Sequence, residues 1–213
     1  MSRTEQASHN RALVLDAARR VFLARGYHAS SVDQIADEAG FSKGVVYSQF
    51  DGKADMFLAL LEDRITERAA HNAELAAEVA GTGDFTRLID DAMRAEREAP
   101  GWRLLVTEFR VLAARDPELN KRYAAAHTRT IDGVASLLAA VAEGATGPLP
   151  LPPRQLAELL LGLEVGLALE QVANPDALGG EAAAEVLASL QGWLASGAPR
   201  GAAPRAARTG SKT

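Results

Sequence analysis

The spacing of apolar side chains predicts helices along almost the entire chain. In the first helix these side chains recur at intervals of three and four, and Gly26 can end it; they belong to Val14, Ala17, Ala18, Val21 and Phe22. The same period, interrupted by glycine and proline, predicts helices over residues 31–39, 42–50, 51–79, 85–99, 102–116, 117–143, 154–173 and 180–196. No stretch alternates apolar and polar residues as a strand does, so we expect an all-α fold of about nine helices.

A serine and glycine pattern predicts that two of the short helices are joined by a tight turn. Ser31 and Gln34 can form a capping box, in which the serine hydroxyl accepts a backbone hydrogen bond and the glutamine reaches back to the serine amide. Gly40 can adopt the left-handed backbone that a turn between crossing helices requires. Ser42 is expected to cap the second helix. Together these features indicate a helix-turn-helix.

The second of these helices carries side chains suited to a DNA groove. It begins with Ser42, Lys43 and Gly44, and such an N-terminal end can lie against a groove. Tyr47 can stack or donate its hydroxyl to a phosphate. Lys53 lies in the first turn of the next helix, whose free amides attract anions. The same residues also fit a plain helical hairpin packed on its neighbours, so taken alone they leave DNA binding open.

Residues 13–61 resemble the DNA-binding region of the TetR (tetracycline-repressor-like) family. The matching runs are Asp16-Ala17-Ala18, Phe22-Leu23-Ala24-Arg25-Gly26-Tyr27, Ser31-Val32-Asp33-Gln34-Ile35-Ala36 and Ala39-Gly40-Phe41-Ser42-Lys43-Gly44-Val45-Val46-Tyr47, followed by Phe50, Lys53 and Phe57. The resemblance implies a homodimer that binds double-stranded operator DNA, with residues 31–39 as a brace and residues 42–50 in the major groove. The remainder of the chain resembles the family only in the number and order of its helices.

The resemblance also assigns individual DNA contacts. By position, Lys43, Gly44, Val45 and Tyr47 would face DNA, and Ser31 and Lys53 would contact phosphates. The chain departs from the family at Ser48 and Gln49, where an aromatic residue and a histidine are common, and at Val45, where Thr or Ala is common. Valine has no hydrogen-bonding group and can at most touch a thymine methyl, so the sequence does not predict the operator.

Charge is divided unevenly along the chain, whose net charge is −5. Residues 1–53 carry seven Lys/Arg and six Asp/Glu, a net of +1, whereas residues 54–196 carry twelve and twenty-two, a net of −10. An acidic body repels a polyanion, so DNA contact is expected only in the first segment. We therefore expect a DNA-binding domain over residues 1–53, a ligand-binding and dimerisation domain over 54–196, and a disordered basic tail over 197–213.

The last two predicted helices are candidates for a dimer interface. The helix over 154–173 is apolar almost all round, so it must be buried on most sides, and a partner chain is an economical cover. The helix over 180–196 has a matching apolar stripe. The expected interface residues are Leu160, Gly162, Gly166, Leu167, Leu187 and Leu190. The alternative is that both helices pack only within one chain.

A small-molecule pocket is expected in the helical body, although the signals for it are sparse. The candidate contacts combine aromatic surface with polar residues on apolar stripes: Trp102, Phe109, Tyr123, His127 and Glu164. His127 and Glu164 also fit structural roles or pairs between subunits. The helix that begins near residue 51 is the one element long enough to connect such a pocket with the DNA-reading end, so an effector that tilts it is expected to release DNA.

Composition excludes several other classes of function. The chain has no cysteine and four scattered histidines, so neither a metal cluster nor a cofactor is expected, and no nucleophile–base pair indicates an enzyme. The N-terminal residues resemble no signal peptide and no apolar run could cross a membrane, so we expect a cytoplasmic protein. A ligand-responsive repressor is the favoured function. A regulator switched by a protein partner and, less so, a helical enzyme remain as alternatives.

Overall fold

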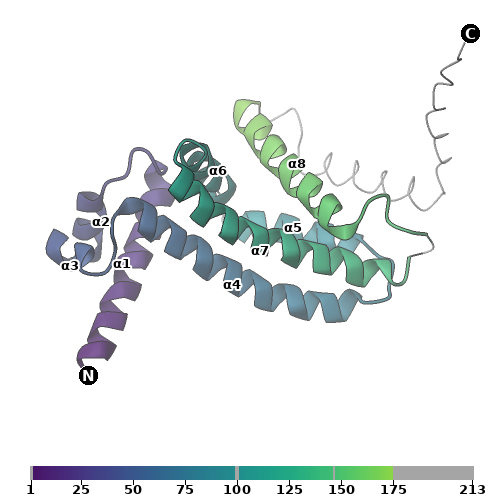
Figure 1. The fold of residues 1–213 in the computed structure, drawn as a ribbon, viewed down its shortest axis with the longest axis horizontal. Helices are drawn as coiled ribbons and strands as arrows, with labels where there is room; N and C mark the ends of the chain where they lie inside the picture. The colour runs from purple at the N-terminus through teal and green to yellow at the C-terminus, as the bar shows by residue number, and fades with distance from the viewer. Residues whose placement is uncertain (1, 99–100, 146, 175–213) are drawn as a thin grey trace, which may run out of the picture.

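A computed structural model describes residues 2–98, 101–145 and 147–174, and these residues form eight helices and no strand. In chain order the helices are α1 (Arg3–Arg25), α2 (Val32–Ala39), α3 (Lys43–Tyr47), α4 (Lys53–Val79), α5 (Thr86–Glu98), α6 (Trp102–Ala113), α7 (Pro117–Ala142) and α8 (Pro153–Ala173). The expected all-α fold is confirmed (Figure 1). The predicted ninth helix over 180–196 and the predicted tail lie outside the described residues.

Helices α1 to α3 form a module at one end of the molecule (Figure 1). Helix α1 begins earlier than the apolar pattern indicated, because a capping box between Ser2 and Glu5 starts it. The predicted capping box at Ser31 is confirmed, since its hydroxyl accepts from the Gln34 amide at 3.2 Å and its own amide donates to Gln34 Oε1 at 3.0 Å. Gly40 has φ 71° and ψ 27°, the left-handed turn expected between α2 and α3.

Helices α4 to α8 form the body, in which α4 packs along α7 and α7 packs along α8. Helix α6 bridges the two ends, because it contacts α1 as well as α7 and α8. The predicted start of α7 is confirmed: the Asp116 carboxylate accepts from two amides of the first turn, and Pro117 occupies the first helical position. Within the described ranges, no helix is long and apolar enough to cross a bilayer, and no group of side chains is arranged to hold a metal ion.

The apolar core is not divided at residue 53, where the sequence suggested a domain boundary. One buried cluster joins side chains of α1, α4, α6 and α7. Its centre is aromatic: the rings of Phe57 and Phe109 stack with centroids 4.2 Å apart, and each also contacts Tyr27 edge-on. The N-terminal module is therefore packed directly on the body through close-packed side chains.

Candidate functional site

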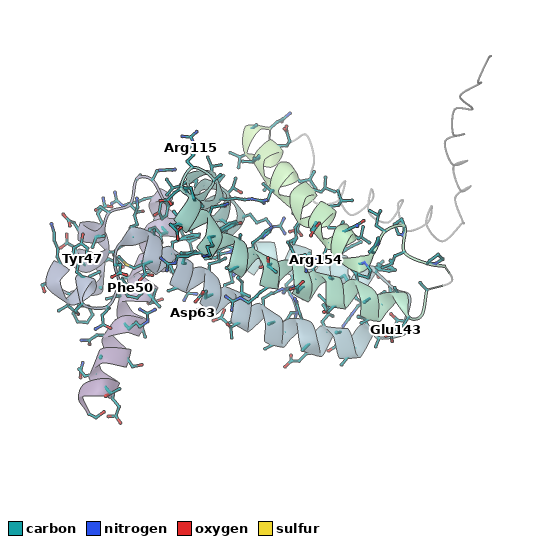
Figure 2. The ribbon with its side chains drawn as sticks, in the orientation of Figure 1. Tyr47, Phe50, Asp63, Arg115, Glu143 and Arg154 are labelled. Atoms are coloured by element: carbon teal, nitrogen blue, oxygen red, sulfur yellow. The ribbon has the colours of Figure 1, made fainter. Side chains whose placement is uncertain are left out.

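The outward face of α3 is the candidate DNA-reading surface. Val46 is fully buried and anchors the helix, whereas Lys43, Gly44 and Tyr47 are exposed, with Tyr47 retaining 56% of its exposure. Figure 2 shows Tyr47 at the opposite end of the molecule from Glu143. A side chain at Gly44 would meet only Ser42 Oγ, at 3.8 Å, so packing within the chain does not require glycine there. Because glycine has no side chain, the backbone at this position is open to close approach by a ligand.

Lys43 is paired with a residue that the sequence reasoning missed. Its ammonium lies 2.6 Å from Asp33 Oδ2 of α2, and this hydrogen bond raises the pKa of Lys43. Both side chains are more than half exposed, so the pair is open to exchange with a phosphate. Asp33, two residues after the Ser31 cap, was visible in the sequence, but its distance from Lys43 depends on the crossing of α2 and α3.

The structure modifies two further DNA-contact predictions. Ser42 occupies the N-cap position of α3 in extended conformation, but its hydroxyl makes no capping hydrogen bond, so the predicted side-chain cap is wrong. Val45 is half-buried and contributes only part of its surface to the exposed face. The short helix also ends at Tyr47 rather than near residue 50, because Ser48 takes the C-cap position. The Ser42 hydroxyl is thus available on the outer face of the module.

Lys53 lies in the first turn of α4, but its side chain points into the module rather than toward solvent. Its ammonium donates to the carbonyls of Tyr27 at 2.7 Å and Ser30 at 2.8 Å and lies over the Tyr27 ring. Burial lowers the pKa of Lys53, opposed by the nearby Glu108 carboxylate. A phosphate contact by this ammonium would require it to leave those carbonyls. In this structure Lys53 instead fixes the loop between α1 and α2.

A carboxylate of the body holds the same loop. Glu108 Oε2 of α6 accepts from the amides of Tyr27 at 2.8 Å and His28 at 3.4 Å. Gly26, which ends α1 with φ 77°, would place a Cβ 2.8 Å from Glu108 Oε1. Glycine is therefore required here both by its backbone conformation and by the carboxylate beside it. No local pattern in the sequence marked Glu108, which lies 81 residues beyond Tyr27.

A cavity of about 850 Å³ lies within the body and is lined by residues of α4 to α8 and their connections. This volume is near the upper end for small-molecule sites. Four of the five predicted ligand contacts line it: Trp102, Tyr123, His127 and Glu164. The prediction for Phe109 is wrong, because its ring is fully buried against Phe57 in the aromatic core and does not reach the cavity.

The polar groups of the cavity are mostly basic, and the sequence reasoning missed them. Arginines on α4, α6 and α7 contribute to the lining: Arg64, Arg68, Arg103, Arg110 and Arg129. Asn72 also lines the cavity, and its buried Oδ1 has no hydrogen-bond partner. Arg68 and Asn72 interrupt an apolar stripe of α4 that runs from Leu61 to Val79. These polar residues on an otherwise apolar stripe were the sequence signal from which a polar cavity wall could have been predicted.

Two carboxylates of the lining are already paired with arginines. Glu164 Oε1 lies 3.6 Å from a guanidinium nitrogen of Arg103. Asp91 of α5 is hydrogen-bonded to Arg68, Arg94 and His71. Burial by itself would raise the pKa of Asp91, but these three hydrogen bonds outweigh it and hold the pKa below its usual value. Arg129 is paired with Glu62, 3.6 Å away, which leaves Arg110 as a lining guanidinium with no carboxylate in ion-pairing distance among the described residues.

The outer face of α8 is an exposed apolar stripe. It contains Leu159, Leu169 and Val172, together with Leu163, which also lines the cavity; the four retain 44% to 65% of their exposure. Gly162 and Gly166 are exposed, and among the described residues a Cβ at either would meet nothing within 4 Å. Leu160 and Leu167, which the sequence assigned to the interface, are half-buried and line the cavity, and their role in an interface stays a prediction. Leu187 and Leu190 lie outside the described residues.

Comparison with known proteins identifies the family. Residues 14–60 match the profile described as bacterial regulatory proteins, tetR family, and residues 82–190 match that of the BetI-type transcriptional repressor C-terminal region. The chain belongs to the TetR family. Both profiles describe transcriptional regulators. The expected resemblance over residues 13–61 is thereby confirmed and extends to the body.

Relatives of this TetR-family chain include a repressor and an activator. The repressor AcnR of Corynebacterium diphtheriae is 31% identical over 132 residues, which is 62% of this chain and 64% of AcnR. The activator FasR of Mycolicibacterium smegmatis is 47% identical over 55 residues, 26% of this chain and 25% of FasR. The chain thus spans a quarter to about two thirds of these relatives. The transcriptional regulator FadR from Bacillus subtilis, solved in complex with stearoyl-CoA, has the same fold, with a TM-score of 0.67 and 20% identity over 87% of this chain and 98% of FadR.

Proposed function

We propose that this protein is a homodimeric repressor that a small molecule, bound in the 850 Å³ cavity, releases from its operator. The observation that carries the proposal is the shared packing of cavity and DNA-reading module. Trp102 lines the cavity and stacks on Phe57, which stacks on Phe109 and contacts Tyr27 of the module. A ligand that displaces Trp102 therefore acts on residues that position α2 and α3.

The exposed face of α3 supports the DNA-binding half of the proposal. Lys43, Gly44 and Tyr47 face outward together, and Ser42 and Ser31 supply hydroxyls beside them. In helix-turn-helix dimers two such helices read successive major grooves about 34 Å apart. Operator affinity then depends on their separation, which is set by the dimer and by the tilt of each module on its body.

The apolar stripe of α8 supports dimerisation. Large apolar side chains rarely cluster at the surface of a monomeric protein, and here four of them lie along one helix with Gly162 and Gly166 between them. Exposed glycines four residues apart allow a second helix to approach closely. A two-fold axis beside α8 would place two modules in one assembly, as a two-fold operator requires.

Helix α4 supports a mechanism of release. Its 27 residues span about 40 Å, from the module to the far end of the body. An effector that binds better to a tilted α4 changes the spacing of the recognition helices and lowers DNA affinity, with a coupling of about 1–3 kcal/mol. The stearoyl-CoA complex of FadR, a protein of this fold, supports a small-molecule effector for this chain.

Repression is favoured over activation by the extent of the matches. The likeness to the activator FasR covers 26% of this chain, whereas the likeness to the repressor AcnR covers 62% and so includes part of the body. The second candidate function is a regulator switched by a protein partner, which the exposed stripe of α8 also fits.

Two measurements test the proposal. Genomic fragments retained by the full-length protein are sequenced to find the operator, and fluorescence anisotropy then follows its release by fractionated metabolites. We expect at least one small-molecule fraction to weaken operator binding fivefold or more. If the operator is bound and only protein fractions release it, the partner-switched alternative holds. A protein that sediments as a monomer at micromolar concentration would contradict the dimer.

A further inference from the structure

We propose that the cavity binds an amphipathic anion, with an acidic headgroup beside Arg110, Tyr123 and His127 and an apolar chain directed away from the DNA-reading module. The inference rests on the proposed function, because it specifies the ligand of the same cavity. Its basis is a polar end and an apolar end of one cavity, which the lining residues define.

The polar end carries hydrogen-bonding groups that the protein leaves unused. Arg110 of α6 has no carboxylate in ion-pairing distance within the described ranges, and it lines the cavity together with Tyr123 and His127. Tyr123 and His127 stack one turn apart on α7, with ring centroids 5.7 Å apart. Among the residues described, neither ring's polar atoms hydrogen-bond to protein. A carboxylate or phosphate satisfies all three groups at once.

The opposite end is lined by apolar side chains. They come from α4, α5, α7 and α8 and belong to Leu75, Phe85, Leu88, Leu137, Leu138, Leu156 and Leu160. Along α4 the lining changes from Arg64 to Leu75 over eleven residues, or about 16 Å. Asn72 lies between the polar and the apolar end. Its buried Oδ1 has no hydrogen-bond partner among the described residues, so it can distinguish ligands by the polarity of the chain atoms beside it. This geometry orients a ligand with its charged group toward the module.

A cationic headgroup fits this cavity poorly. The carboxylates Asp91 and Glu164 are paired with arginines, and Asp84 accepts from the Thr86 amide at 2.9 Å. An incoming cation would have to displace an arginine from Asp91 or Glu164, or compete with the hydrogen bonds that Thr86 donates to Asp84. It would also meet the guanidinium groups of the same wall, which lowers its affinity through like-charge repulsion. The cavity wall therefore favours an anionic headgroup over a cationic one, in addition to favouring an apolar chain.

Three probes with the same tail test the headgroup. Dodecanoate, dodecanol and dodecyltrimethylammonium, each below its aggregation concentration, are titrated into the full-length protein by calorimetry. We expect dodecanoate to bind at least tenfold more tightly than dodecanol, and the ammonium to bind weakest. Shortening the acid from twelve to ten carbons should weaken binding about tenfold, since each buried methylene contributes about a threefold to fourfold change.

A matched pair of variants locates the headgroup. Arg110→Gln should weaken dodecanoate binding tenfold or more and leave dodecanol binding unchanged, because only the acid uses the charge. Arg115→Gln removes the same charge from the turn after α6, outside the cavity lining, where Figure 2 shows the side chain extending away from the body. This control should bind both probes as the wild type does. Equal loss of both probes in Arg110→Gln would overturn the headgroup assignment.

The same probes separate this inference from the proposed function. Dodecanoate that binds without weakening operator binding would support the ligand class and contradict effector release. Tighter binding of the ammonium or the alcohol than of the acid would overturn the ligand class, whether or not those compounds release DNA. Absence of binding by every acid from eight to sixteen carbons would also overturn it, while release by another metabolite fraction would leave the proposed function standing.

Discussion

Glu108 of α6 and Lys53 of α4 hold the same loop between α1 and α2. The carboxylate accepts from the amides of Tyr27 and His28, and the ammonium donates to the carbonyls of Tyr27 and Ser30. Helices α4 and α6 also contribute to the cavity wall. A ligand that changes the separation of these helices must therefore move or strain the loop that leads into α2. The two side chains therefore connect helices of the cavity wall with the DNA-reading module.

This connection predicts that Glu108 carries part of the coupling between ligand and DNA. Glu108→Ala leaves two backbone amides without their acceptor, which should destabilise the fold by about 1–3 kcal/mol. Effector affinity measured with and without operator should differ less in this variant than in the wild type. Glu108→Gln keeps a carbonyl acceptor and serves as the control, with coupling close to that of the wild type. Unchanged coupling in Glu108→Ala would exclude the loop as a route.

Lys43 and Lys53 should differ in how their loss affects DNA binding. Lys43 is exposed on α3, so Lys43→Ala should weaken operator binding by about 1–3 kcal/mol per half-site if it contacts a base. If it contacts phosphate alone, the slope of log affinity against log salt concentration should fall in magnitude by about one. Lys53 is held by carbonyls of the loop, so Lys53→Ala should mainly lower the free energy of unfolding. Anisotropy at several salt concentrations and urea unfolding separate the two effects.

Lys121→Ala is the control for this comparison. It removes the same charge from the exposed surface of α7, in the body. Its operator affinity and salt dependence should match those of the wild type. A salt slope that falls equally in Lys43→Ala and Lys121→Ala would show a general charge effect and contradict a contact by Lys43.

Local signals predicted the turn of this protein well, but they did not predict which side chains face inward. The Ser31 capping box and the left-handed Gly40 depend on neighbours within a few residues, and both were predictable. The partners of Lys53 lie 23 to 26 residues away, so its inward orientation depends on how α4 packs on α1.

The errors within the body have the same origin. Trp102 and Phe109 share one apolar stripe of α6, yet only Trp102 reaches the cavity, because Phe57 of α4 covers Phe109. Helix α8 is apolar on all sides, so its pattern could not distinguish the inward Leu160 from the exposed Leu159. In both cases the deciding contact comes from another helix and leaves no periodic trace in the sequence.

Tyr27 should make the protein less stable in alkaline solution. Burial raises the pKa of Tyr27 from 10.0 to about 12. The unfolded chain therefore loses this proton first, and the stability that the protonated phenol contributes is present below pH 10 and lost as pH rises toward 12. Urea unfolding between pH 9 and pH 12 should show a decline to which this group contributes about 2 kcal/mol. Tyr27→Phe keeps the ring and should reduce the decline; an identical profile would exclude Tyr27 as its source.

A substitution at an exposed glycine of α8 distinguishes a dimer interface from an apolar surface that no partner covers. Across the part of the chain that the structure describes, a Cβ at Gly166 meets nothing within 4 Å, so Gly166→Leu should leave the monomer fold intact and favour the helix by up to about 1 kcal/mol. If a partner helix packs against this face, the same leucine prevents close approach and sedimentation equilibrium should show a large shift to monomer. Operator affinity should fall with it, because two recognition helices must bind together.

Leu160→Ala is the matched control: its side chain packs inward against α7, so it should lower the free energy of unfolding by about 2–5 kcal/mol while the native protein still dimerises. A Gly166→Leu protein that dimerises and binds operator as the wild type does would place the interface elsewhere.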